Sequence, residues 1–384
     1  MIAAGGTGGG VFPALAVASE LISGAATRAA ADQAPVAIRW VGGLGGMEAD
    51  LVQRAGIPFD AIHSGGVHGV GWRLPLNALS LGRGFFEALR LVHLFKPDAL
   101  FVTGGFVAAP VALAAWASAV PIVAYVPDLE PALALGVVSR LARRLAVTAE
   151  DSRRYFPGRQ ARKVVVTGYP TRPELGSVTR PEAVRQLGLT AERPTILVTG
   201  GSRGARSLNR AVVAALPDWL RRYQVVHLTG QTDWAEVQAA RTALPEDLRA
   251  AYHALPFLHE MGLALAAADL VISRAGASTL GEYPLFGLPA VLVPYPHAWR
   301  YQKVNADYLV ARGAAVRLND EVLPARLRAE VTNLMEDEPR LSRMRAAARA
   351  AARPDAARRI AAEIVALGRH GPEDVSLPEM NDRP

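Results

Sequence analysis

The chain has 384 residues, of which 51% are hydrophobic and 20% charged, a balance typical of a folded protein of about two domains and not of a disordered one. It contains no cysteine, which excludes disulfide scaffolds, thiolate metal sites and cysteine nucleophiles. The formal net charge is +7, but only Lys96, Lys163 and Lys303 are lysines, and an arginine excess beside so much alanine does not by itself indicate a nucleic-acid partner.

Short β-rich runs alternate with segments of helical length from Gly5 to about Gly168. Because such alternation produces parallel sheets with helices on both faces, we expect an α/β unit here. The expected strands are Val36–Val41, Ile57–His63, Ala99–Thr103, Ile122–Val126, Leu145–Thr148 and Val164–Thr167. They are preceded by a first strand of which only Ile2, Ala3 and Ala4 stand before the first glycine turn, so that strand is short or the true start codon lies upstream. The expected helices include Pro13–Ser23, Phe85–Leu94 and Pro110–Ser118.

One stretch, residues 103–126, carries no charge and is long enough to span a bilayer. Glycines and prolines interrupt it, and its end reads as a break followed by a buried strand, so we expect a helix and a strand and not a membrane span. The N-terminus lacks the basic start and apolar core of a signal peptide.

The alternation restarts after a proline-rich, charged stretch from Tyr169 to Pro194. Strands are expected at Thr195–Thr199, Gln224–Leu228, Leu270–Ser273 and Ala290–Val293, and helices after Ala205, Ser278, Arg300 and Leu323. We therefore predict an α/β protein with two doubly wound, Rossmann-like domains and an interdomain cleft. The expected division is a first domain at 1–168, a linker at 169–193, a second domain at 194–368 and a disordered tail at 369–384.

Three glycine-rich turns each follow an expected strand and open an expected helix. They are Gly5–Pro13, Thr103–Pro110 and Thr199–Ala205. Glycine lets the backbone approach an anion closely, and the unsatisfied N–H groups of the helix start then point at it. One such turn could be purely structural, but three in the same context favour phosphate binding.

Two common nucleotide-binding motifs are absent from the sequence. Reading G-x-G-x-x-G from Gly6 gives Gly6, Gly8 and Val11, so the third glycine is missing, and no acidic residue ends the second strand. No Gly-Lys-Ser or Gly-Lys-Thr of a P-loop occurs. These absences argue against an NAD-dependent dehydrogenase and a P-loop enzyme.

The densest polar segment is Ser273–Glu282, where a strand ends near Ser273 and a helix begins near Ala277. We expect its N–H groups and the Thr279 hydroxyl to face the cleft. Glu282 can accept hydrogen bonds from two ribose hydroxyls, although a carboxylate there also complements a helix N-terminus. A second polar rim is expected at Arg300, Gln302 and Asn305.

The three loops and the Ser273–Glu282 segment, in this order, resemble the family of bacterial transferases that convert lipid I into lipid II in peptidoglycan synthesis, and the resemblance spans about residues 1–365. It implies a two-domain GT-B fold. It also implies an inverting, metal-independent transfer of N-acetylglucosamine (GlcNAc) from UDP-GlcNAc to undecaprenyl-diphospho-MurNAc-pentapeptide, without a cofactor. The expected location is peripheral, at the cytoplasmic face of the cell membrane, with an anionic membrane surface as a partner and no nucleic acid.

The resemblance also implies roles for individual residues. Donor binding would involve Arg172, Ser202, Arg203, Phe257, Leu258, Ala277, Ser278, Thr279, Glu282 and Gln302. Among these, Ser202 would bind a phosphate, Glu282 the ribose, and the backbone of Phe257 and Leu258 the uracil. The GlcNAc hydroxyls would be addressed by Ala277, Ser278, Thr279 and Gln302. The acceptor diphosphate would be held by Thr7, Gly8, Gly9, Gly10, Gly104 and Gly105.

The sequence departs from the family pattern mainly on the acceptor side. Gly10 stands where the family has histidine, and Tyr125–Asp128 replaces a His-Glu-Gln-Asn segment. Arg203 and Tyr301 each replace a glutamine. The donor half therefore matches the family well, while the acceptor half is altered.

Glycosyl transfer requires a base for the acceptor hydroxyl and stabilisation of the departing diphosphate. Asp128 and Glu130 follow a strand that is expected to face the cleft, so we hypothesise that one of them is the base. The alternative, that they cap the next helix, stays open. Loop N–H groups, helix dipoles and Arg172 or Arg203 could stabilise the diphosphate without a metal.

Apolar and basic residues alternate between His63 and His93, as in an interfacial membrane patch or an ordinary core helix. These residues include Trp72, Arg73, Leu74, Leu76, Leu79, Leu81, Arg83, Phe85, Phe86 and Arg90. His63, His68 and His93 lack a zinc-ligand spacing with a third partner, so we expect no metal site. A second basic group, which suits anionic lipid or simply a solvated face, comprises Arg140, Arg143, Arg144, Arg153, Arg154, Arg159, Arg162 and Lys163.

Three functions remain open at this point. The first is the lipid II-forming GlcNAc transferase. The second is a related UDP-sugar transferase with another lipid acceptor, such as diacylglycerol. The third is a non-catalytic sugar-nucleotide-binding homologue, which the glycine at position 10 keeps possible.

Overall fold

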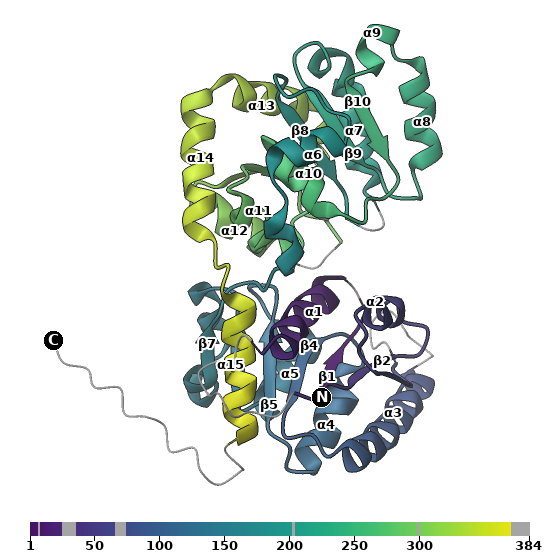
Figure 1. Cartoon of the computed structure of the whole chain (residues 1–384), viewed down its shortest axis with the longest axis vertical. Coiled ribbons are helices and arrows are strands. Elements are labelled where there is room, and N and C mark those ends of the chain that lie inside the picture. Colours follow the sequence, from purple (N-terminus) through teal and green to yellow (C-terminus); the bar gives the residue numbers. More distant parts are fainter. Residues whose placement is uncertain (7, 25–35, 66–73, 202–203, 298–299, 370–384) are drawn as a thin grey trace, which may run out of the picture. The chain divides into compact units, whose positions relative to one another are not determined.

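The computed structural model describes residues 1–6, 8–24, 36–65, 74–201, 204–297 and 300–369, without the side chains of 74–79 and 369. They form two compact units. The first comprises Met1–Pro127, Pro131–Thr167 and the segment that begins at Asp355; the second comprises Asp128–Glu130 and Gly168–Pro354. Each unit has one parallel sheet and surrounding helices (Figure 1), which confirms the α/β, Rossmann-like prediction.

The sheet of the first unit has the strand order β3-β2-β1-β4-β5-β6-β7, and every pairing in it is parallel. Its strands are β1 (Ile2–Ala4), β2 (Trp40–Gly43), β3 (Phe59–Ile62), β4 (Leu100–Gly104), β5 (Ile122–Val126), β6 (Arg144–Val147) and β7 (Val164–Val166). Its helices are α1 (Gly8–Ile22), α2 (Glu48–Arg54), α3 (Leu74–Phe95), α4 (Ala108–Ala117), α5 (Leu133–Leu141) and α15 (Ala356–Arg369), with 3₁₀ turns at Glu150–Tyr155 and Gly158–Lys163.

The charge-free stretch 103–126 folds as predicted, into the end of β4, helix α4 and strand β5. All residues of β4 and β5 are buried, as expected for central strands covered on both faces. Helix α4 packs against α3 and α5, so its alanine-rich surface lies inside the unit. Within the described part of the chain, no helix combines the length and the apolar character needed to cross a membrane.

The sheet of the second unit has the order β10-β9-β8-β11-β12-β13 and is also parallel throughout. Its strands are β8 (Thr195–Thr199), β9 (Gln224–Leu228), β10 (Tyr252–Leu255), β11 (Leu270–Ser273), β12 (Ala290–Leu292) and β13 (Ala315–Arg317). Its helices are α6 (Arg180–Gln186), α7 (Arg206–Trp219), α8 (Trp234–Ala243), α9 (Glu246–Arg249), α10 (Met261–Ala267), α11 (Glu282–Phe286), α12 (Tyr301–Ala311), α13 (Leu323–Glu336) and α14 (Glu338–Ala351), with 3₁₀ turns at Pro173–Ser177, Ala277–Leu280 and Asp320–Val322.

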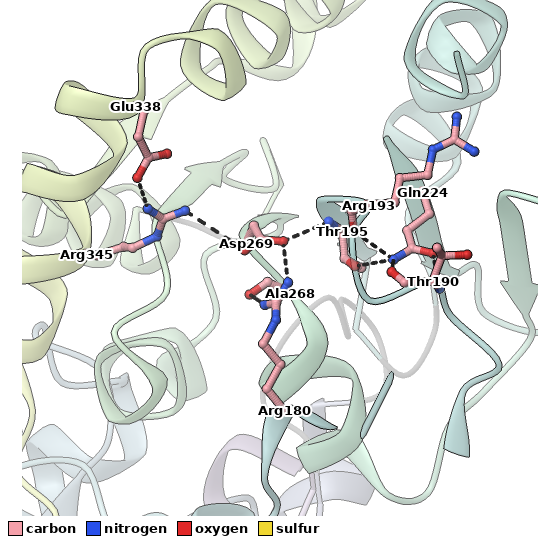
Figure 2. A network of polar contacts seen from close by, with 9 residues as sticks. All are labelled: Arg180, Thr190, Arg193, Thr195, Gln224, Ala268, Asp269, Glu338 and Arg345. Carbon is pink, nitrogen blue, oxygen red and sulfur yellow. Dashed lines mark hydrogen bonds and ion pairs between the residues drawn. The ribbon is translucent and has the colours of Figure 1, made fainter. Parts of the chain in front are cut away.

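Residues 169–193, expected as a linker, belong to the body of the second unit. Asp269 accepts hydrogen bonds from Arg180 and from the backbone N–H of Thr195, each at 2.8 Å, and pairs with Arg345 (Figure 2). The Gln224 side chain accepts a hydrogen bond from the backbone N–H of Thr190 and donates one to the Thr190 carbonyl. Since helix α6 also packs against α10, these residues are a fixed part of the second unit and not a free connection.

The last helix lies in the first unit, although residues up to 368 were expected in the second domain. The second unit ends at Pro354, and α15 begins two residues later. Helix α15 packs against α1, and Figure 1 shows it in yellow alongside the strands of the first unit. The side chain of Arg144 on β6 donates to Glu363 on α15 at 3.3 Å. The expected tail lies outside the described residues beyond position 369.

Candidate functional site

The strand order of the second sheet reverses between β8 and β11. At such a point the loops that follow the two strands leave in opposite directions and open a crevice at the carboxyl edge, where α/β proteins bind ligands. The loop after β8 is the third glycine turn, and the loop after β11 is the Ser273–Glu282 segment. Because the sheet is parallel, the loops after β10 and β12 reach the same edge. The first carries Phe257, and the second leads into helix α12, whose first turn contains Gln302.

The third glycine turn packs closely on the neighbouring strand end. A β-carbon on Gly204 would lie 2.2 Å from the carbonyl oxygen of Thr229, and Gly204 also has a φ of +77°. Gly201, with a φ of +83°, donates its N–H to the Thr199 hydroxyl at 3.3 Å. Only glycine suits these positions. Two residues assigned to donor binding, Ser202 and Arg203, lie outside the described residues.

A buried polar network supports the helix that follows this turn. Asn209 donates to the carbonyl of Thr229 and to Asp233, both at 2.9 Å, so its Oδ1 faces His227 at 3.0 Å and must accept from it. His227 therefore carries its proton on Nε2 and accepts from the Tyr252 hydroxyl at 2.8 Å through Nδ1. Complete burial lowers the pKa of His227 to about 3, which keeps the ring neutral.

The segment after β11 forms a 3₁₀ turn at Ala277–Leu280 before the short helix α11. Contrary to expectation, the Thr279 hydroxyl is buried and donates to the carbonyl of Gly276 at 2.7 Å. A threonine three residues after a carbonyl commonly closes a turn in this way. Ala277 is buried and Ser278 half-buried, so Ser278 is the more accessible of these side chains.

Glu282, at the start of α11, is buried, and burial raises its pKa to about 7, while the neighbouring Arg172 guanidinium acts in the opposite direction. Tyr169, three residues before Arg172, packs against Gly281, the residue next to Glu282. A β-carbon on Gly281 would lie 2.5 Å from the Tyr169 ring, so this close packing brings the segment with Arg172 near Glu282. The structure thus brings together Arg172 and Glu282, which are far apart in sequence, and makes the carboxylate titratable near neutral pH.

Gln302 lies in the first turn of α12 and is held through one end of its amide. Its Oε1 accepts a hydrogen bond from the backbone N–H of Tyr295 at 2.8 Å. Among the described residues its Nε2 has no hydrogen-bond partner. The amide is therefore oriented with its donor end available to a ligand.

Phe257 and Leu258 follow β10, a strand that the sequence analysis did not identify. The Phe257 side chain is exposed, and its ring meets the His259 ring edge to face at 4.9 Å between centroids. Leu258 is half-buried.

The acidic segment Asp128–Glu130 makes specific contacts with α12. Asn305 donates to Asp128 Oδ1 at 2.7 Å, while Arg300 binds both oxygens of Glu130 at 2.7 and 2.8 Å through its Nε. Burial raises the pKa of Asp128, and the hydrogen bond from Asn305 opposes this. Helix α5 has Ala132 at its N-cap without a side-chain hydrogen bond, so neither acid caps it.

The first two glycine loops meet in the first unit, where the strand order reverses between β1 and β4. Gly104 ends β4, and a β-carbon on Gly105 would lie 2.3 Å from the Gly5 carbonyl oxygen. Gly8, Gly9 and Gly10 form the first turn of α1, and the Thr103 hydroxyl donates to the Gly10 carbonyl at 2.8 Å. Thr7 lies outside the described residues.

Glu48 is a member of this loop cluster that the sequence analysis missed. Its side chain is 1% exposed and accepts from the backbone N–H of Gly43 at 2.8 Å and of Gly6 at 3.4 Å. A buried carboxylate requires such hydrogen bonds. No local motif signals this contact, because an acidic residue in the first turn of a helix is common for its own sake.

Helix α3 presents basic and apolar side chains on one face. Arg83, Phe86, Arg90 and Leu94 are exposed and follow one another at helical spacing. Trp72, Arg73 and His68 lie outside the described residues, as do the side chains of Leu74, Leu76 and Leu79. His63 pairs with Glu87 at 2.8 Å, and among the described residues no group of three or more His, Asp or Glu could hold a metal ion.

The second basic group also lies at the surface of the first unit. Exposed members are Arg140, Arg143, Arg153, Arg154, Arg159 and Arg162. Arg153 pairs with Glu150, Arg144 pairs with Glu363, and the Lys163 ammonium donates to the Arg140 carbonyl at 3.1 Å. Part of the positive charge is therefore offset within the unit.

Two protein families match successive parts of the chain. The glycosyltransferase family 28 N-terminal domain matches residues 1–146, and the glycosyltransferase family 28 C-terminal domain matches residues 195–360. Two curated relatives, from Roseiflexus sp. (strain RS-1) and Symbiobacterium thermophilum, are each 40% identical to the chain. Both are named UDP-N-acetylglucosamine–N-acetylmuramyl-(pentapeptide) pyrophosphoryl-undecaprenol N-acetylglucosamine transferase. The first match covers 93% of this chain and 92% of the relative, and the second 97% of each.

Solved structures show the same architecture. MurG of Acinetobacter baumannii superposes with a TM-score of 0.73 at 29% identity, over 95% of this chain and 99% of that one. A putative UDP-N-acetylglucosamine 2-epimerase from Listeria monocytogenes superposes with a TM-score of 0.68 at 16% identity, over 98% and 99%, which shows a shared fold alone.

Proposed function

The chain belongs to the MurG family of N-acetylglucosaminyltransferases, and from this membership we infer that it transfers GlcNAc from UDP-GlcNAc to lipid I, giving lipid II in peptidoglycan synthesis. The observation that carries this inference is that relatives named for this transfer match both halves of the chain at 40% identity. The altered acceptor-side positions, Gly10 and Asp128, fall within residues 1–146, which the glycosyltransferase family 28 N-terminal domain matches. A transferase acting on diacylglycerol is not favoured.

On the donor side, we assign the UDP-GlcNAc site to the carboxyl edge of the second sheet. Glu282 would accept hydrogen bonds from the ribose hydroxyls, and Gln302 would donate its free amide N–H to a GlcNAc hydroxyl. Ala277, Ser278 and Thr279 would contact the sugar through the turn, and the backbone of Phe257 and Leu258 would read uracil. Ser202, Arg203 and Arg172 would hold the diphosphate.

The diphosphate needs stabilisation as it departs. Arg172 carries positive charge beside Glu282, and the third glycine turn leads into the N-terminus of α7, where a helix dipole favours an anion. On the acceptor side, the loops with Thr7, Gly8–Gly10 and Gly104–Gly105 would hold the lipid diphosphate in the same manner. The proposed transfer is inverting and uses these protein groups without a metal.

We assign the base to Asp128 in preference to Glu130. Glu130 is 7% exposed and binds Arg300 through both of its oxygens, which leaves it poorly placed to accept a proton. Asp128 uses one oxygen for Asn305, and among the described residues its Oδ2 has no hydrogen-bond partner. A carboxylate with one oxygen held and the other available suits proton abstraction.

The enzyme would reach its lipid-linked acceptor by binding the membrane peripherally at its cytoplasmic face. Exposed Phe86 and Leu94 on α3 supply apolar contact, and Arg83 and Arg90 supply attraction for anionic headgroups. The second basic group, Arg140–Lys163, would strengthen this attraction. No nucleic acid is expected as a partner.

The decisive experiment supplies the purified chain with UDP-GlcNAc and either a lipid I analogue or diacylglycerol, and identifies the products by mass spectrometry. We expect a lipid II analogue and no glycosylated diacylglycerol. Turnover on diacylglycerol alone would replace the proposal with a different lipid transferase. Binding of UDP-GlcNAc without turnover on either acceptor would leave a sugar-nucleotide-binding protein.

A further inference from the structure

Asn305, in the second turn of α12, is completely buried and forms three hydrogen bonds with fixed directions. Its Nδ2 donates to Asp128 Oδ1 at 2.7 Å and to the Ala275 carbonyl at 3.1 Å, and its Oδ1 accepts from the Leu129 N–H at 3.2 Å. Rotating the amide by 180° would place an NH₂ group against the Leu129 N–H and an oxygen against two acceptors. The arrangement therefore has a single favourable orientation.

The same helix holds the other end of the acidic segment. Arg300, directly before α12, binds Glu130, while Asn305 binds Asp128 and Leu129. The N-cap residue of α5, Ala132, makes no side-chain hydrogen bond. The Asp128 side chain is thus held by α12, while the preceding Pro127 carbonyl accepts from the Thr148 hydroxyl at 2.8 Å. Through the Ala275 carbonyl, Asn305 also contacts the turn that begins the proposed GlcNAc-binding segment.

We propose that Asn305 is a positioning residue for glycosyl transfer, which holds Asp128 Oδ1 and so presents Asp128 Oδ2 to the acceptor hydroxyl. The proposal rests on the function and the base assignment given above. In the step, the acceptor oxygen forms a bond to C1 of GlcNAc and its proton moves to Asp128 Oδ2. The bond from C1 to the diphosphate oxygen breaks, and its electron pair leaves with UDP.

The charges around this segment are mutually compensated. Glu130 pairs with Arg300, and Arg274, next to Ala275, pairs with Asp320 at 2.5 Å. Asn305 then supplies the hydrogen bond that favours the ionised form of Asp128 against burial. Loss of Asn305 should raise the pKa of Asp128, so that the acidic limb of the rate profile moves to higher pH.

The test compares four full-length variants in the lipid I assay across pH, together with their melting temperatures. They are Asn305→Ala, Asp128→Asn, the exchanged pair Asp128→Asn with Asn305→Asp, and the control Asn209→Ala. The exchanged pair can still form a hydrogen bond between positions 128 and 305, but it lacks the carboxylate at 128. Asn209 is another buried asparagine of the second unit, with hydrogen bonds to Thr229 and Asp233.

For Asn305→Ala we expect kcat to fall roughly 10- to 100-fold, with a smaller change in KM for UDP-GlcNAc and the acidic limb at higher pH. Asp128→Asn and the exchanged pair should both lose roughly 10²- to 10⁴-fold in kcat. Asn209→Ala should lower the melting temperature and leave the acidic limb in place.

Two results would overturn the proposal. One is an Asn305→Ala enzyme with near-native kcat and an unmoved acidic limb. The other is an exchanged pair that regains activity, since the hydrogen bond would then matter only for structure. Full activity of Asp128→Asn would refute the base assignment and this proposal together, whereas a wild-type chain inactive on lipid I would refute the proposed function itself.

Discussion

The carbonyl oxygen of Gly5 occupies the space beside Gly105, where a β-carbon would lie only 2.3 Å away. Gly105 also has a φ of +83°, a backbone conformation that L-residues with a side chain rarely adopt. The short contact and the positive φ both require glycine at position 105. The absence of a side chain there lets the loop after β4 lie directly against the loop after β1.

We expect Gly105→Ala to destabilise the first unit by about 2–4 kcal/mol, because the substitution adds a steric clash to a strained backbone. Gly10→Ala is the matched control, since its β-carbon would make ordinary 3.5 Å contacts with Thr103 in the first turn of α1. That control should stay within about 1 kcal/mol of wild type. Chemical denaturation of the full chain measures both, and equal stability of the two variants would contradict the packing described.

The second prediction concerns the pH dependence of donor binding. Glu282 has a pKa of about 7 in the free protein, and only its ionised form accepts hydrogen bonds through both oxygens. Affinity for UDP-GlcNAc should therefore fall about tenfold between pH 8 and pH 6. Glu282→Gln should bind roughly 10- to 100-fold more weakly at pH 8 and show a flat pH profile by calorimetry.

The same substitution should raise stability. A carboxyl whose folded pKa lies above its ordinary value of 4.5 favours folding at low pH and loses that contribution as the pH rises toward 7. Glu282→Gln should thus be about 1–3 kcal/mol more stable than wild type at pH 8. A variant that is destabilised at pH 8 would argue against a buried, costly carboxylate.

The third prediction uses His227, whose pKa of about 3 lies below the ordinary 6.5. The unfolded chain gains a proton near pH 6.5 and the folded chain does not, so acidification favours unfolding. The free energy of unfolding should drop by about 2 kcal/mol between pH 7 and pH 5 through this residue alone. His227→Gln should remove that portion of the slope, measured by urea denaturation at both pH values, and an unchanged slope would contradict the neutral, buried ring.

The fourth prediction addresses the membrane face. Reversing Arg83 and Arg90 on α3 to glutamate should weaken binding to anionic vesicles at least roughly 30-fold, because each basic residue near the surface contributes about 1 kcal/mol and the new carboxylates are repelled. Arg222 and Arg328 are exposed residues of the second unit and serve as the reversal control. Liposome flotation with anionic and neutral vesicles checks the result, and equal flotation of both double variants would exclude α3 as the contact.

Most of the strands could be predicted because central parallel strands are short apolar runs bounded by glycine and polar residues. The same criterion misses two strands of the second sheet, because they lack a continuous apolar run. Tyr252–Leu255 and Ala315–Arg317 lie at or near the sheet edges, where residues are only half-buried and the apolar pattern is weak. Residues 169–193 suggested a linker by composition, yet Asp269 and Gln224, far along the chain, satisfy their polar groups.

By itself, the sequence determined the parallel α/β architecture, the three glycine turns and the family, because each is encoded in local patterns of a few consecutive residues. Only the tertiary structure decided which polar groups meet: Glu48 with the Gly6 N–H, Arg300 with Glu130, and Asn305 with Asp128. The last pair is separated by 177 positions. Such contacts depend on which loops the order of the parallel strands places side by side. A buried polar group forms hydrogen bonds with its neighbours in space, whatever their distance in sequence.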